Sequence, residues 1–306
     1  MSLLDFIESY FANSLVITTI FAFCAVAAAL LVIFSLGRSS PRLRVGVLFT
    51  LFSTVVFGWV FVAASFVFCN QFLGLYTTAG ERAVQVVLGL ALLTGLVATV
   101  PFSVFVTLSV PRAMIKRLEK DSVSAQEVSC FPLERIMETM GLSGLALLRS
   151  PSDSPLAYSI GGKRRAALVF SDGLERLLDR EEMQAVVTHE LAHIKNDDTR
   201  AKIFISAYRR VLFFDPALRL VERLYAREKE LLADEVAMRF TGKPKALASA
   251  LLKISSNTNS VACDLTSSIS EGDMRVKPSV KERINRLLKQ TERAQLESAL
   301  PEAQQR

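Results

Sequence analysis

The sequence predicts a mostly α-helical membrane protein, in which N-terminal transmembrane helices precede an α+β domain with a small β-hairpin or sheet. The first third of the 306-residue chain holds three long apolar segments, and the remainder mixes charged residues with apolar ones at helical spacing. A hydrophobic share of 51% and a mean hydropathy of +0.34 are high for a water-soluble protein. We therefore expect a membrane domain at 1–112, a second domain at 113–290 and a polar tail at 291–306.

Three apolar segments are long enough to cross a bilayer, at 15–36, 45–75 and 83–110. A hydrocarbon core of ~30 Å requires about 20 residues at roughly 1.5 Å per residue. The first segment differs from a signal peptide, because Asp5 and Glu8 precede it and its apolar run is too long. We expect three transmembrane helices.

Basic residues in the connections predict how these helices are oriented. Arg38, Arg42 and Arg44 follow the first segment, whereas the second connection holds only the Glu81–Arg82 pair. Because lysine and arginine favour cytoplasmic loops, we expect the N-terminus outside and the second domain in the cytoplasm. The formal charge of +6 fits attraction to a membrane surface, and the sequence has no nucleic-acid-binding motif. We expect the lipid bilayer, and not nucleic acid, as a partner.

A well-marked helix follows in the second domain. Asp179 and Glu182 form a capping-box pattern that predicts its first turn. An apolar stripe at helical spacing comes next, made of Met183, Val186, Val187, Leu191 and Ile194. This helix carries His189 and His193, which are the only two histidines of the chain.

The two histidines enclose Glu190 in a His-Glu-x-x-His pattern. Their spacing puts both imidazoles on one helix face, where they can bind one zinc ion while Glu190 reaches a zinc-bound water. The pattern also occurs by chance on amphipathic helices, but the lack of any other histidine favours the metal site. It predicts metal-assisted hydrolysis of a peptide bond.

A catalytic zinc site usually has a third protein ligand, and no histidine remains to supply it. Glu230 and Asp234 lie four residues apart in a predicted helix and share a face. We expect Glu230 to bind the metal and Asp234 to hold a ligand histidine through its other ring nitrogen. We interpret Glu228 and Lys229 as a solvated charge run, and Asp198 as part of a solvated helix terminus.

These motifs resemble a known family. His189–Asn196 followed by Glu230–Asp234 is similar to the integral-membrane zinc metallopeptidases of the HtpX and CAAX prenyl protease family, and to their relatives, the antibiotic-sensing membrane metallopeptidases. The resemblance implies a zincin-like domain in which both histidines and Glu230 bind one zinc ion per chain. It also implies that Glu190 is the general base.

The resemblance spans approximately Arg112 to Gln290. Ser154–Ser159 and Ala167–Ser171 are similar to the hairpin that precedes the motif helix, and Val280–Leu287 to the C-terminal Glu-Arg-Ile segment. Family members often have His-Pro before that segment, but Lys277 and Pro278 stand there in this chain, so any role of that histidine is lost. The branch of the family stays open.

The resemblance implies a zinc-dependent endopeptidase that acts at the cytoplasmic membrane surface. Its expected substrates are membrane-associated or misfolded proteins, with a role in membrane-protein quality control. Two alternatives remain, a signalling metallopeptidase of the sensor type and a catalytically silent membrane scaffold. In each case we expect a multi-pass protein of a prokaryotic plasma membrane.

Further expectations concern the surroundings of the site. Ala167–Phe170 could present a free strand edge on which a peptide binds as an added strand. Tyr208, Tyr225 and Arg283 are candidates for stabilising an oxyanion, although packing or an ion pair explains each equally well. Charged residues interrupt Ile203–Leu224, so we expect an amphipathic helix pair there and not a fourth membrane crossing.

Proline and polar residues predict the remaining elements. Pro216 should open the second helix of that pair. Pro244–Ile254 reads as another helix, and Ser255–Lys277 as a long loop that could form a flap near the site. The four cysteines form no Cys-x-x-Cys pair, so we expect neither a cysteine metal site nor a disulfide framework.

Overall fold

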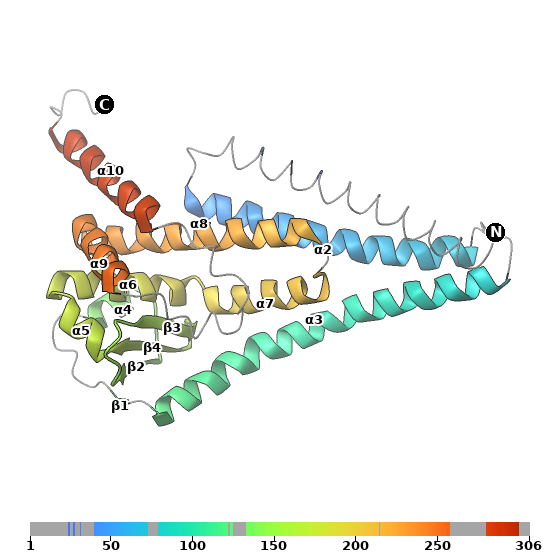
Figure 1. The fold of residues 1–306 in the computed structure, drawn as a ribbon, viewed down its shortest axis with the longest axis horizontal. Helices are drawn as coiled ribbons and strands as arrows, with labels where there is room; N and C mark the ends of the chain where they lie inside the picture. The colour runs from blue at the N-terminus through green and yellow to red at the C-terminus, as the bar shows by residue number, and fades with distance from the viewer. Residues whose placement is uncertain are drawn as a thin grey trace. The chain divides into compact units, whose positions relative to one another are not determined.

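A computed structural model describes residues 40–72, 79–121, 123–124, 133–213, 215–257 and 280–299, together with Cys24, Ala27 and Leu31. These residues form long helices and one four-stranded sheet (Figure 1). The prediction of a mostly helical chain with a small sheet is therefore confirmed. The chain divides into two compact units: one holds Met1–Val106 and Ile203–Tyr225, and the other holds Thr107–Lys202 and Ala226–Arg306.

The first unit contains helices that overlap the second and third predicted membrane segments. These helices are α2 (Pro41–Phe72) and the N-terminal part of α3 (Ala79–Asp121). Among the described residues, Pro41–Trp59 has the length and hydropathy needed to cross a membrane. The predicted segment at 15–36 lies outside the described residues, apart from three isolated positions. A multi-pass topology thus stays a prediction.

The predicted helix pair at 203–224 is made by α7 (Asp198–Val211) and α8 (Pro216–Thr241). Pro216 is the first residue of α8, as predicted. Asp215, just before it, accepts hydrogen bonds from Trp59 Nε1 of α2 and from the backbone N–H of Ala217, both at 2.8 Å. The first bond fastens the turn between the two helices to α2 within the first unit, and the second satisfies a backbone N–H at the start of α8.

The sheet of the second unit has the strand order β1-β2-β4-β3. Its strands are β1 (Val123–Ser124), β2 (Leu145–Ser150), β3 (Ala157–Gly162) and β4 (Arg165–Ser171). β2 and β4 are parallel, whereas β1–β2 and β3–β4 are antiparallel. The β3–β4 hairpin is the one predicted before the motif helix.

The prediction of a free strand edge at Ala167–Phe170 is wrong. These residues belong to β4, which pairs with β2 on one side and with β3 on the other. Every residue from Ala166 to Ser171 is buried, as expected for a near-continuous apolar run in the middle of a sheet. Among the described strands, β3 lies at this end of the sheet.

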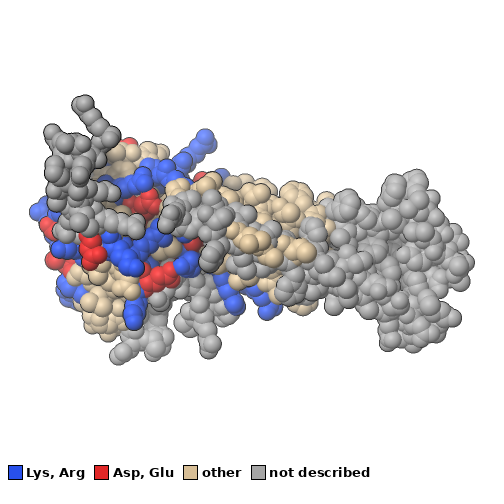
Figure 2. Space-filling model, turned by 90° about the horizontal axis from the view of Figure 1, so that it is seen from above, with Lys and Arg blue, Asp and Glu red and all other residues tan. Residues whose placement is uncertain are grey.

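Helices cover the sheet and join one another through a second core. Ile115 of α3 packs on one face of the sheet with Leu148, Ile160, Ala167 and Val169. The other helices of the second unit are α4 (Leu133–Met140), α5 (Asp172–Leu177), α6 (Arg180–Lys195), α9 (Pro244–Asn257) and α10 (Val280–Ala299). Small and apolar side chains of α6, α8, α9 and α10 form a cluster, consisting of Ala185, Ala237, Leu247, Ala248 and Leu287. On the face drawn in Figure 2, basic and acidic side chains lie interspersed.

Candidate metal centre

The helix that carries both histidines begins where the sequence predicts. Asp179 Oδ1 accepts from two backbone N–H groups of the first turn of α6 at 2.9 Å each, and Glu182 Oε2 accepts from the Asp179 N–H at 2.9 Å. This capping box is confirmed. Because α6 ends at Lys195, His189 lies well inside the helix and His193 in its last turn.

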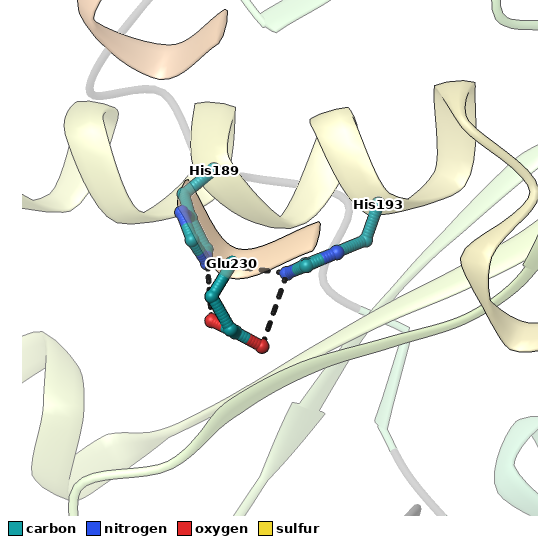
Figure 3. Close-up of side chains that lie close together, drawn as sticks. All are labelled: His189, His193 and Glu230. Atoms are coloured by element: carbon teal, nitrogen blue, oxygen red, sulfur yellow. Dashed lines mark hydrogen bonds and ion pairs between the residues drawn. The ribbon is translucent and has the colours of Figure 1, made fainter. Parts of the chain in front are cut away.

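His189, His193 and Glu230 point toward one another from α6 and α8 (Figure 3). The two Nε2 atoms are 3.2 Å apart, and the Glu230 oxygens lie 3.5 Å from His189 Nε2 and 3.8 Å from His193 Nε2. With one ligand atom chosen per residue, all separations are within 4.8 Å. Tetrahedral bonds of about 2.0–2.2 Å place ligand atoms roughly 3.3–3.6 Å apart, so these three residues can hold a metal ion.

His189 is braced from behind by Asp234, where the sequence predicts this contact. Asp234 Oδ1 lies 3.0 Å from His189 Nδ1, and Arg283 of α10 binds the same carboxylate through Nη2 at 2.6 Å and Nε at 2.8 Å. Burial raises the pKa of Asp234, but Arg283 and His189 more than offset that effect, so this pKa lies below its usual value. Asp234 is thus a buried carboxylate that accepts from both neighbours.

The surroundings of His189 favour a positive charge. Burial lowers the pKa of this imidazole, but its hydrogen bonds to Asp234 and Glu230 more than compensate and raise the pKa to about 9. The nearby guanidinium of Arg283 acts in the opposite direction. The two carboxylates therefore stabilise a cation here, whether that cation is a proton or a metal ion.

His193 has a bracing carboxylate of its own, which is Asp198. Asp198 Oδ2 lies 2.7 Å from His193 Nδ1, and Lys229 Nζ lies 2.5 Å from Asp198 Oδ1. Asp198 is 1% exposed and Lys229 is 6% exposed. The interpretations of Asp198 as a solvated terminus and of Lys229 as part of a solvated charge run are therefore wrong.

The sharp turn between α6 and α7 explains the position of Asp198. Asp197 has φ of 53°, in the left-handed region that aspartate tolerates better than most residues, so α7 begins at once and Asp198 returns to the last turn of α6. β3 lies against this turn at Gly162, where an added Cβ would meet the Asp197 side chain. A larger residue at this end of β3 would therefore require the Asp197 side chain to move.

The interpretation of Glu228 and Lys229 as a solvated charge run is wrong because this part of α8 is buried. All residues from Glu228 to Asp234 are buried, so this part of α8 has no solvent-facing side. Glu228 is 1% exposed and its carboxylate lies 3.2 Å from the guanidinium of Arg227. A run of charged residues in a sequence suggests a solvent-exposed helix face, but here the charged side chains form ion pairs inside the protein.

Glu190 lies next to His189 on α6 and is only partly buried, unlike the three grouped residues. The Ser159 hydroxyl of β3 lies 2.8 Å from Glu190 Oε2 and 3.1 Å from the Glu190 backbone oxygen. Ser159 therefore orients the carboxylate that the sequence predicts as the base. The sequence did not predict this role of Ser159. The alternation of side chains along a short strand does not show which helix lies beside it.

The three oxyanion candidates lie in different surroundings. Tyr208 and Tyr225 are buried in the first unit, where Tyr208 stands edge-on to Phe52 with ring centroids 6.3 Å apart. Arg283 lies at the metal centre, with Nη1 3.3 Å from Glu230 Oε2. Its paired contact with Asp234 fits the ion-pair explanation of this residue.

The chain matches a known peptidase family over most of its length. The sequence model of the BlaR1 peptidase M56 family matches residues 75–287, which is more than half of the chain. The chain belongs to the BlaR1 peptidase M56 family. The matched range contains every residue of the candidate metal centre, from Ser159 to Arg283.

Curated relatives of this M56 chain are named as proteases. A protease HtpX homolog of Pyrococcus abyssi is 29% identical over 158 residues, covering 40% of this chain and 55% of that protein. Another from Pyrococcus furiosus is 30% identical over 160 residues, with 40% and 55% coverage. The chain spans about half the length of these relatives. The predicted resemblance to HtpX-like membrane metallopeptidases is confirmed.

Among solved structures, the chain is similar to Ste24p of S. mikatae. The two are 18% identical, with a TM-score of 0.42, and the match covers 62% of this chain and 57% of that one.

Proposed function

We propose that this M56 chain is a membrane-anchored, zinc-dependent endopeptidase. The observation that carries the proposal is the convergence of His189, His193 and Glu230 beside Glu190 on one helix pair. Two imidazole nitrogens and one carboxylate oxygen are a ligand set of catalytic zinc sites that keep a fourth position for water. When bound, zinc lowers the pKa of such a water and polarises a peptide carbonyl.

The chain's own residues divide the remaining work. Glu190 accepts the proton of the attacking water and delivers it to the departing amine, which makes it both general base and general acid. Ser159 holds the Glu190 carboxylate at 2.8 Å, so the base is oriented before substrate arrives. Asp234 and Asp198 fix the two histidines through their Nδ1 atoms, at 3.0 and 2.7 Å.

The outer edge of β3 is the proposed place for the polypeptide substrate. β3 is terminal among the described strands, and an end strand can pair with an added one. The Gly161 N–H already donates to Thr199 Oγ1 at 3.3 Å, and Ser159–Gly162 are buried, so the proposal concerns the half-buried start of the strand, at Ala157–Tyr158. Ser159 of this same strand contacts Glu190, so a peptide along β3 would pass close to the base. This edge replaces the one predicted on β4.

The membrane part of the proposal rests on α2 and on the charge pattern. Pro41–Trp59 can cross a bilayer by length and hydropathy, and Arg38, Arg42 and Arg44 lie at its start. We propose a multi-pass protein with the metal centre at the cytoplasmic surface, and membrane-associated or misfolded proteins as substrates. The relatives named as protease HtpX homologs support a protease, and we propose membrane-protein quality control as its role.

A matched pair of variants tests the proposal. The full chain is purified in detergent as wild type, Glu190→Gln and Glu181→Gln, and each is assayed for bound zinc and for cleavage of an unfolded membrane protein or of itself. Glu181 is the control, because it lies exposed on the same helix and pairs with Lys243 at 2.6 Å. We expect one zinc ion per chain in all three forms and loss of cleavage in Glu190→Gln alone.

Two results would contradict the proposal at different levels. If all three forms hold zinc and the wild type cleaves no more than Glu190→Gln does, the chain is a catalytically silent scaffold. If the wild type holds no stoichiometric zinc, the ligand assignment fails.

A sensor-type signalling peptidase is the second candidate, because the matching family model is that of the BlaR1 peptidase. It predicts cleavage only when an external ligand is present. Constitutive cleavage by the purified chain would exclude it.

A further inference from the structure

Each of the two histidines contacts a carboxylate through its Nδ1 atom, and each carboxylate contacts a buried cation. The first set of contacts joins His189, Asp234 and Arg283, and the second joins His193, Asp198 and Lys229. We propose that Lys229 is a positioning residue of the metal centre, which fixes the Asp198 carboxylate so that His193 keeps Nε2 directed at the metal. This inference rests on the proposed function.

The contacts of Asp198 show how Lys229 could hold this carboxylate in place. One oxygen faces His193 Nδ1 at 2.7 Å and the other faces Lys229 Nζ at 2.5 Å, so each partner holds one side of the carboxylate. Asp198 is 1% exposed, and a buried carboxylate without a compensating cation is strongly unfavourable. Lys229 both compensates this charge and restricts rotation of the carboxylate.

The location of Lys229 on α8 links it to the proposed metal ligand Glu230. Lys229 directly precedes Glu230, and Asp234 follows one helical turn later. One helix therefore supplies a metal ligand, the carboxylate that braces His189, and the cation that braces the carboxylate of His193. Any displacement of α8 against α6 would alter all three contacts together.

A purely structural role for Lys229 makes a different prediction. If its ion pair only fastened the first turn of α7 to α8, removing the charge would lower stability and leave metal affinity unchanged. If Lys229 positions His193, metal affinity and the geometry at the metal should change as well. Zinc affinity and the absorption spectrum of bound cobalt(II) separate these two roles.

The experiment compares Lys229→Gln and Lys229→Arg with wild type, using the full chain in detergent. We expect Lys229→Gln to bind zinc about tenfold more weakly, since loss of outer contacts at metal sites costs roughly 10–100-fold in affinity. Its cobalt(II) spectrum should shift, and Lys229→Arg, which keeps the charge, should recover most of the affinity. The Glu190-dependent cleavage of the wild type is measured in parallel.

Lys253→Gln is the matched control. Lys253 of α9 lies 2.7 Å from the buried carboxylate of Glu182 on α6, away from the metal ligands. Removing this ion pair should lower stability while zinc affinity and the cobalt spectrum stay as in wild type.

A double variant keeps the test decisive if Lys229→Gln alone does not fold. Asp198→Asn combined with Lys229→Gln leaves no uncompensated charge at this position. It should bind zinc as Asp198→Asn alone does, because Lys229 acts through Asp198. Affinity of a folded Lys229→Gln within about twofold of wild type, or independent losses in the double variant, would overturn the inference. A wild type without zinc would instead contradict the proposed function itself.

Discussion

Replacing Glu182 by glutamine tests how the helix that carries the histidines is anchored. Glu182 is 3% exposed at the start of α6. Its carboxylate accepts from the Asp179 N–H at 2.9 Å, from the Ser249 hydroxyl at 2.6 Å and from Lys253 Nζ at 2.7 Å. The carboxylate therefore closes the capping box and ties α6 to α9 at once.

The expected loss follows from these contacts. A glutamine amide keeps one acceptor oxygen for the Asp179 N–H but cannot form the charge-assisted bond with Lys253. Such bonds contribute about 1.5–3 kcal/mol when shielded, but the Lys253 side chain is 41% exposed, so solvent screening reduces its share to about 1 kcal/mol. Removing a negative charge from the first turn of a helix costs about another 0.3–1 kcal/mol. We expect Glu182→Gln to lower the free energy of unfolding by roughly 1.3–2 kcal/mol.

The pH dependence of this loss identifies its cause. Burial raises the pKa of Glu182, but hydrogen bonds from Lys253, Ser249 and the Asp179 backbone more than offset it, so the folded pKa lies below the usual value. The ionised carboxylate therefore stabilises the fold above the unfolded pKa of about 4.3, and this contribution disappears as pH falls through the folded pKa. The difference between wild type and variant should stay constant from neutral pH to about pH 5.5 and shrink below about pH 4.3.

Denaturant unfolding followed by circular dichroism measures this difference in detergent at several pH values. Glu181→Gln also removes a first-turn charge and an exposed ion pair with Lys243, but no buried contact, so it should lower stability by only about 0.3–1 kcal/mol. A loss for Glu182→Gln that is equally small, or that is the same at pH 3.5 as at pH 7, would refute the reasoning.

Three further changes test the metal centre itself. Glu230→Gln removes a proposed ligand charge and should weaken zinc binding by roughly 10²-fold or more while the helical circular dichroism is kept; unchanged zinc content on dialysis against a chelator would contradict the ligand assignment. Ser159→Ala removes the hydroxyl that lies 2.8 Å from Glu190 and should lower kcat about tenfold with zinc content unchanged; equal kcat values would show that Ser159 does not orient the base. A chelator should abolish cleavage and added zinc should restore it, whereas cleavage that persists after metal analysis shows no zinc would exclude a metallopeptidase.

Local patterns in the sequence were sufficient for the motif helix and for the grouped residues. The capping box at Asp179 depends on four consecutive residues, and helical spacing fixes the shared face of His189 and His193. The same spacing put Glu230 and Asp234 on one face of α8, and the structure brings both of them to His189. These features follow from the geometry of a single helix.

Features that depend on packing between elements could not be predicted in this way. The burial of Asp198 and Lys229 requires the turn after α6 and the enclosure of α8, and neither has a signature in the charges of the sequence. β4 is central because β2, which comes before β3 in the chain, pairs with its other edge. The order of the strands along the chain does not reveal this pairing. Ser159 meets Glu190 only because β3 lies beside α6.

The turn between α6 and α7 limits how this chain can vary over evolution. One added residue there would rotate the start of α7 by about 100° and carry the Asp198 carboxylate away from His193. Gly162 of β3 also lies close to this turn, and a larger residue at position 162 would require the Asp197 side chain to move. We therefore expect the interval of residues from His193 to Asp198 to resist insertion and deletion, so that its fixed length can help to recognise chains that retain this metal centre.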